Sequence, residues 1–232
     1  MELCPPDPFS TLLPILEPAA ITNLYGPPGV GKTNICLILA LACVKGGGTV
    51  AYIDSEGGFA VERVKQLEPE CESALQRIDL IQPKNFKEQA AAIKALREKP
   101  YDLVILDSSV ALYRLEYAEQ ETKKGRFENQ HVLEANRELS VQLAALSTLA
   151  RDRNIPVLIT AHAFNRFEDN GLDVVGGDAM KYWSKTIVQI ERVGTPGERL
   201  ATLVKHRFRP EGMQVKFEIV EAGIKPAGFR MF

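Results

Sequence analysis

Short apolar runs alternate with longer apolar or amphipathic stretches along this chain as far as residue 161. The short runs predict β-strands at residues 20–25, 49–54, 77–82, 101–107 and 155–161. The longer stretches predict helices at residues 33–45, 59–67, 86–98 and 129–152. Strands and helices that alternate at this spacing predict an α/β fold with a mainly parallel, doubly wound sheet.

The pattern changes after Lys185, where strand-like runs follow one another without a helix between them. These runs cover residues 186–192, 199–206 and 214–220, and turns rich in glycine and proline join them. We therefore expect C-terminal antiparallel strands to extend the sheet. Two segments, 115–128 and 163–179, are predicted to be irregular, and both follow the carboxyl ends of parallel strands, where ligands bind in open α/β sheets.

A glycine-rich motif lies between the first predicted strand and the first predicted helix. It matches G-x-x-x-x-G-K-[ST] and consists of Gly26, Pro27, Pro28, Gly29, Val30, Gly31, Lys32 and Thr33. The glycines allow backbone N–H groups to curl around a β-phosphate, and the helix N-terminus adds partial positive charge. Lys32 is expected to reach the β- and γ-phosphates, and the Thr33 hydroxyl to ligate Mg²⁺. The motif, with the adjoining Asn34, therefore predicts a site for ATP and Mg²⁺; the alternative is an incidental glycine-rich turn.

Two acidic residues follow predicted strands that should lie near this motif. Asp107 ends the apolar run 103–106 and is the candidate Walker B acid, which holds Mg²⁺, usually through water. Glu56 follows the strand 49–54, where a carboxylate can orient and polarise the attacking water. The alternatives are a strand-terminal cap for Asp107 and a solvated loop residue for Glu56.

The composition is that of an ordinary globular protein, with 45% hydrophobic and 25% charged residues. A net charge of −2 argues against a histone-like cationic protein but leaves room for a local basic patch. The cysteines form no C-x-x-C pair and the histidines are scattered, so no zinc site is expected. We find no secretory leader pattern and no apolar run of about 18 residues, and so expect a cytoplasmic protein with no membrane contact.

The chain carries three motifs that together resemble the RecA/RadA recombinase superfamily: Tyr-Gly-Pro-Pro-Gly-Val-Gly-Lys-Thr, Tyr-Ile-Asp-Ser-Glu-Gly-Gly-Phe and Val-Ile-Leu-Asp-Ser-Ser. The likeness is greatest to the RadB family of short archaeal RadA paralogues and covers about residues 20–224. It implies a RecA-like P-loop ATPase core. Because the P-loop begins at residue 26, we expect residues 1–232 to form this single core domain, without an N-terminal helical DNA-binding domain.

The resemblance assigns roles to residues at matching positions. Lys32 and Thr33 match the family's phosphate and Mg²⁺ contacts, Glu56 its catalytic glutamate and Asp107 its Walker B acid. Arg63 matches the arginine that stacks on adenine, a contact that suits a planar guanidinium. Without the resemblance, Arg63 would be expected to be a solvated helix residue.

The sequence also differs from recombinases at several positions. His162 stands where recombinases carry the glutamine that senses the γ-phosphate. Residues 13–18 replace a Gly-Gly turn, and the N-terminal segment contains no convincing Phe-x-x-Ala polymerisation motif. Because the sensor is altered and neither irregular segment is strongly cationic, we expect weak ATP hydrolysis at most.

The densest basic run is Lys205-His206-Arg207-Phe208-Arg209, on a predicted strand and the turn after it. The two-residue period of a strand predicts that Lys205, Arg207 and Arg209 share one face. Three interpretations remain open: a solvated basic edge strand, a patch that binds DNA phosphates, or a finger that reaches the γ-phosphate in an adjacent subunit.

The RadB resemblance implies an ATP-binding, DNA-binding accessory protein of homologous recombination and DNA repair. Such a protein would not perform strand exchange alone. Its expected partners are DNA, the main RadA-type recombinase and a junction-processing nuclease, and a homo-oligomer stays open. The alternative is a KaiC-like regulatory ATPase that acts on a protein partner without DNA. A helicase-type motor is less favoured because no additional domain is evident.

Overall fold

The computed structural model describes residues 2–121, 128–165, 171–194 and 196–227. Its helices are α1 (Phe9–Leu12), α2 (Lys32–Lys45), α3 (Val61–Leu67), α4 (Glu72–Leu75), α5 (Phe86–Ala95), α6 (Ala111–Glu121), α7 (Glu128–Arg153) and α8 (Gly177–Trp183), with a 3₁₀ turn at Leu96–Glu98. Its strands are β1 (Ala20–Gly26), β2 (Val50–Asp54), β3 (Ile78–Ile81), β4 (Leu103–Asp107), β5 (Pro156–Asn165), β6 (Leu172–Val174), β7 (Thr186–Arg192), β8 (Glu198–Lys205), β9 (Gln214–Val220) and β10 (Gly223–Pro226).

The strands form one sheet in the order β10-β9-β8-β7-β1-β5-β4-β2-β3, and β6 pairs with β5 outside this path. Strands β7, β1, β5, β4, β2 and β3 run parallel, whereas β8, β9 and β10 pair antiparallel beyond β7. The predicted parallel α/β sheet with a C-terminal antiparallel extension is therefore confirmed.

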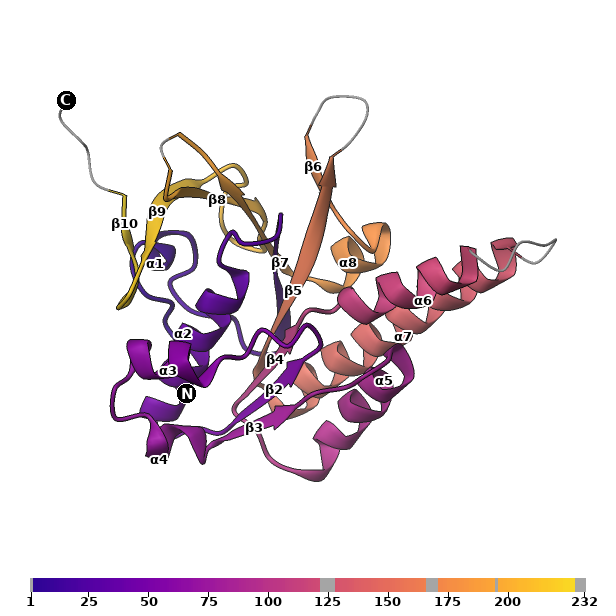
Figure 1. The fold of residues 1–232 in the computed structure, drawn as a ribbon, viewed down its shortest axis with the longest axis horizontal. Coiled ribbons are helices and arrows are strands. Elements are labelled where there is room, and N and C mark those ends of the chain that lie inside the picture. Colours follow the sequence, from indigo (N-terminus) through magenta and orange to yellow (C-terminus); the bar gives the residue numbers. More distant parts are fainter. Residues whose placement is uncertain (1, 122–127, 166–170, 195, 228–232) are drawn as a thin grey trace.

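Helices cover both faces of the sheet (Figure 1). On one face, α1 to α4 contribute to a core with Phe9, Tyr52 and Phe217. On the other face, α5 to α8 contribute to a second core around Leu143 and Ile159. Strand β1 is buried along its whole length because it lies between β5 and β7 with helices on both sides. The P-loop therefore starts from a central strand of the sheet.

The prediction that residues 115–128 and 163–179 are irregular is wrong for most of their described parts. Helix α6 continues to Glu121, β5 continues to Asn165 and pairs antiparallel with β6, and α8 begins at Gly177. The paired segments, 163–165 and 172–174, contain three residues each, which is too short for an alternating pattern to predict a strand. Lys123, Lys124, Arg126 and Arg166 lie outside the described residues.

The prediction of a continuous basic face on one strand is also wrong. Strand β8 ends at Lys205, and its pairing with β7 shifts register near that end. His206 then turns inward, where its Nε2 lies 3.4 Å from Glu17 Oε1 and its Nδ1 accepts a hydrogen bond from the Phe208 backbone N–H. Arg207 and Arg209 consequently belong to a turn.

No helix among the described residues is long and apolar enough to cross a membrane.

Candidate nucleotide-binding site

The P-loop connects the carboxyl end of β1 to the N-terminus of α2. A side chain at Gly26 would place its Cβ 2.0 Å from the backbone oxygen of Ile190 on β7, so only glycine fits between the two strands. Gly31, the residue before α2, has a φ of 101°, which glycine adopts at little cost. These constraints explain the glycines at both ends of the loop.

Lys32 places its ammonium group at the mouth of the P-loop. Its Nζ donates hydrogen bonds to the backbone oxygens of Gly26 at 2.9 Å and Pro27 at 3.1 Å. Burial lowers the pKa of Lys32, whereas the nearby carboxylates of Glu56 and Asp107 oppose this effect. A cation held against a glycine-rich loop at a helix N-terminus fits an anionic phosphate group.

Asp107 lies at the carboxyl end of β4, next to the P-loop helix. Thr160 Oγ1 donates to its Oδ1 at 2.6 Å, and the Tyr52 hydroxyl donates to its Oδ2 at 3.0 Å. Burial raises the pKa of Asp107, and hydrogen bonds from Thr160, Thr33 and Tyr52 counteract that rise. The structure thus brings together Thr33 and Asp107, an oxygen donor set that fits Mg²⁺ beside a phosphate.

Asp54 fixes the loop that carries Glu56, and the sequence analysis did not identify this residue. Asp54 is 2% exposed. Its Oδ1 accepts backbone N–H bonds from Glu56 at 3.3 Å and Gly58 at 3.0 Å, and its Oδ2 accepts one from Phe59 at 3.1 Å. An acid at a strand end followed by a Gly-Gly pair was the available signal, since Asp side chains often bond backbone groups of the following turn.

Glu56 and His162 contact each other directly. His162 Nε2 lies 2.7 Å from Glu56 Oε1, although 106 residues separate the two in sequence. His162 is near the middle of β5 and lies opposite Gly26 of β1 in the sheet. The hydrogen bond from His162 lowers the pKa of Glu56, burial opposes it, and Ser108 and Lys32 lower it further. The predicted sensor therefore lies beside the predicted base.

Arg63 and Asn34 join the P-loop helix to the C-terminal strands. Arg63 Nε donates to Asn34 Oδ1 at 2.7 Å, and its Nη atoms donate to the backbone oxygens of Val220 and Glu221, both at 2.8 Å. Asn34 Nδ2 donates to the Gly223 oxygen at 3.4 Å. Arg63 is therefore a fixed guanidinium beside α2 rather than the solvated residue expected from its helix position alone.

Comparison with known proteins places these features in a family. The Rad51 family model matches residues 10–227. Two curated relatives are the DNA repair and recombination proteins RadB of Methanobrevibacter smithii and of Methanococcus maripaludis. Each is 38% identical; the first match covers 90% of this chain and 88% of the relative, and the second covers 90% and 93%. The chain belongs to the RadB family, within Rad51.

A solved structure agrees with this assignment. The crystal structure of the RadB recombinase superposes with a TM-score of 0.78 at 34% sequence identity, and the match covers 96% of this chain and 97% of that one. The RecA-like fold and the RadB resemblance expected from the motifs are both confirmed.

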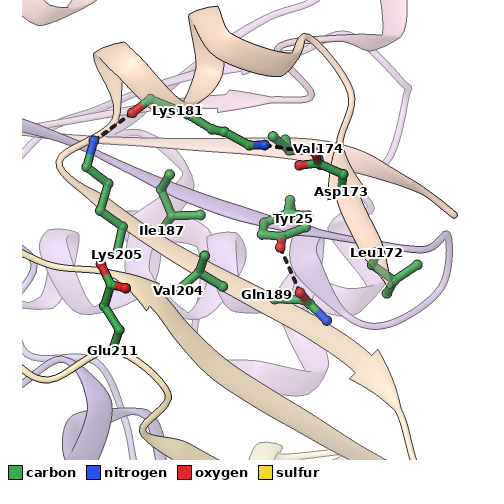
Figure 2. Close-up of a pocket in the computed structure, with 10 residues that line it drawn as sticks. All are labelled: Tyr25, Leu172, Asp173, Val174, Lys181, Ile187, Gln189, Val204, Lys205 and Glu211. Atoms are coloured by element: carbon green, nitrogen blue, oxygen red, sulfur yellow. Dashed lines mark hydrogen bonds and ion pairs between the residues drawn. The ribbon is translucent and has the colours of Figure 1, made fainter. Parts of the chain in front are cut away.

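The basic run of this RadB-family chain does not contribute to the nucleotide-binding site of the same chain. Lys205 Nζ donates to the backbone oxygens of Lys181 at 2.6 Å and Ser184 at 3.0 Å, at the C-terminal end of α8. Burial, and then Lys185, lower the pKa of Lys205. Figure 2 shows Lys205 reaching Lys181 beside a cavity of about 380 Å³, where Tyr25 points toward Gln189.

Arg207 and Arg209 line a different hollow, of about 620 Å³, between the turn after β8 and residues 14–18. Phe208, which lies between them in sequence, is 80% exposed. Arg207 and Phe208 are exposed and Arg209 is half-buried, and all three line a hollow that does not include Lys205.

Arg192 is a further cation at the P-loop that the sequence analysis missed. It ends β7, and its Nη2 donates to the Gly29 backbone oxygen at 3.3 Å. No sequence signal identified it, because its position depends on the pairing of β7 with β1, in which Gln189 lies opposite Tyr25.

Proposed function

We propose that this RadB-family chain is an ATP-binding, DNA-binding accessory protein of homologous recombination and DNA repair. The observation that carries the proposal is the convergence of Lys32, Thr33, Glu56 and Asp107 at one sheet edge. Family membership supports it, since the relatives are named DNA repair and recombination proteins.

The P-loop backbone from Gly26 to Thr33 would bind the phosphates of ATP, and Lys32 would neutralise their charge. Thr33 and Asp107 would hold Mg²⁺, which, when bound, neutralises charge that develops on the phosphates. Glu56 would accept a proton from the attacking water. We propose that turnover is weak and that ATP acts mainly as a conformational ligand, since His162 takes the sensor position and engages Glu56.

The turn that carries the exposed Arg207 and the half-buried Arg209 supports contact with an anionic partner. Two guanidinium groups can bind phosphates, and the exposed Phe208 ring can stack on a base. DNA phosphates and the nucleotide of a neighbouring subunit are both candidates. We propose DNA as the principal partner, and a main RadA-type recombinase or a junction-processing nuclease as the protein that the chain assists.

Nucleotide binding is tested by titration of a fluorescent ATP analogue with Mg²⁺ into the wild type and Lys32→Ala. We expect saturable binding that the substitution abolishes. Glu72→Ala, an exposed residue on α4, is the control for surface changes and should bind like the wild type. Equal binding by wild type and Lys32→Ala would place the nucleotide elsewhere.

DNA binding is tested by fluorescence anisotropy of labelled single-stranded DNA at low salt. The double variant Arg207→Ala/Arg209→Ala should bind more weakly and show a shallower salt dependence, because it neutralises fewer phosphates. Absence of wild-type DNA binding at low salt, or rapid strand exchange by the chain alone, would contradict the proposal. ATP turnover that depends on protein concentration but not on DNA would instead favour a regulatory ATPase.

A further inference from the structure

The carboxylate of Glu56 is engaged by a histidine of its own chain. His162 Nε2 lies 2.7 Å from Oε1. Ser108 lies near enough to lower the pKa of Glu56 as well, and its Oγ accepts the Val110 backbone N–H at 3.2 Å. A general base needs an oxygen lone pair aimed at water, and the contact with His162 holds Oε1 and fixes the direction of the carboxylate.

The surroundings of His162 identify which ring nitrogen carries its proton. Its Nδ1 is buried and has no hydrogen-bond partner among the described residues. A proton on Nδ1 would therefore be a buried donor without an acceptor, which is costly. We assign the proton to Nε2 from this network, so the ring donates to the Glu56 carboxylate. A hydrogen bond to an ionised acceptor is stronger than a neutral one.

The two partners differ in their freedom to move. The backbone of His162 is fixed on both sides, since it lies opposite Gly26 of β1 and its oxygen accepts the Val175 N–H at 2.9 Å. The His162 side chain is 14% exposed, whereas that of Glu56 is 38% exposed and extends from a loop. The contact therefore opens more readily by rotation of Glu56 into solvent than by movement of the largely buried imidazole.

We propose that His162 is a positioning residue that holds Glu56 in a resting arrangement, so that ATP hydrolysis requires this hydrogen bond to open. The inference rests on the proposed function, because it presupposes that the P-loop binds ATP. Low turnover then has one cause, the contact between His162 on β5 and Glu56 in the loop after β2.

The test compares ATP turnover and ATP affinity of the full chain with those of His162→Ala. We expect kcat to rise about tenfold, which corresponds to about 1.4 kcal/mol of activation free energy, with unchanged affinity for the ATP analogue. The double variant His162→Ala/Glu56→Gln should fall to the level of Glu56→Gln. Phe164→Ala, two residues further along β5 and exposed, is the matched control and should turn over ATP like the wild type.

An unchanged or lower kcat of His162→Ala with intact ATP binding overturns the inference and leaves the proposed function in place. Absence of ATP binding by the wild type overturns both. Nitrogen-15 NMR of the wild-type imidazole provides a measurement that does not depend on the variant folding. The inference predicts a proton on Nε2 whose signal shifts in Glu56→Gln, and a proton on Nδ1 alone contradicts it.

Discussion

Replacing Asp54 with asparagine removes one anionic oxygen from beneath the Glu56 loop and leaves the side-chain volume nearly unchanged. In the most favourable orientation, the remaining oxygen still accepts from Glu56 and Gly58. The new amide then faces the Phe59 N–H and the Gln82 side-chain amide, which donates to Oδ2 at 3.3 Å. At least one buried hydrogen bond to a charged group is then lost and one N–H is left unpaired. We expect the free energy of unfolding to fall by about 2–3 kcal/mol.

The same substitution should slow ATP turnover more than it weakens ATP binding. Asp54 hydrogen-bonds to the loop that carries Glu56 and, among the described residues, to no residue of the P-loop. A displacement of about 1 Å at a catalytic group such as Glu56 costs roughly 100-fold in rate. Urea unfolding measures the stability change, and an unchanged dependence of free energy on urea concentration shows that the unfolded state is unaffected. Steady-state turnover measures the effect on Glu56.

Asp79→Asn is the matched control for this prediction. Asp79 lies on the neighbouring β3, bonds to Lys99 at 2.9 Å and Tyr101 at 2.7 Å, and has a side chain that is 41% exposed. Because this ion pair is partly solvated, we expect Asp79→Asn to lower the free energy of unfolding by less than about 1 kcal/mol. If Asp54→Asn and Asp79→Asn unfold at the same urea concentration and turn over ATP equally, Asp54 does not organise the loop.

The remaining predictions concern the P-loop glycine, the arginine on α3 and pH. Gly26→Ala should destabilise the fold by about 1–3 kcal/mol and abolish ATP binding, since its Cβ meets the Ile190 oxygen. Gly47→Ala, which has open space around it but a φ of 85°, should also lower stability and yet retain binding in the same titration. Arg63→Ala should lower the thermal midpoint and increase hydrogen exchange in β9 and β10, because it removes the bonds to Val220 and Glu221; unchanged exchange there would refute this link. The pKa of Glu56 is lowered from its ordinary value of 4.5, so its stabilising effect is present above that pH and is lost as pH falls through the lowered value. The stability difference between wild type and Glu56→Gln should therefore shrink on acidification in pH-dependent unfolding, and a constant difference would contradict the assignment.

The sequence predicted the parts of the molecule that follow from local pattern. Parallel strands, the glycine loop and the acid at residue 107 each have a short motif, and a central strand buried on both faces has a continuous apolar run. These features predict the Walker acid beside the P-loop from the sequence alone.

The contacts between distant segments were not predictable in the same way. The hydrogen bond from His162 to Glu56 depends on the relative register of β1, β5 and the loop after β2. Arg63 bonds to backbone oxygens of a turn about 157 residues away, and backbone oxygens leave no signal in a sequence. The basic run was misplaced because His206 turns toward the buried Glu17, which ends the strand.

The most direct test of ATP-dependent DNA binding is the affinity of single-stranded DNA for the wild type and Lys32→Ala, each measured at low salt with Mg²⁺, both with and without saturating ATP. The account predicts saturable wild-type binding that ATP changes, and Lys32→Ala binding that is insensitive to ATP. Wild-type protein that does not bind DNA, or that binds it with the same affinity with and without ATP, would contradict the account.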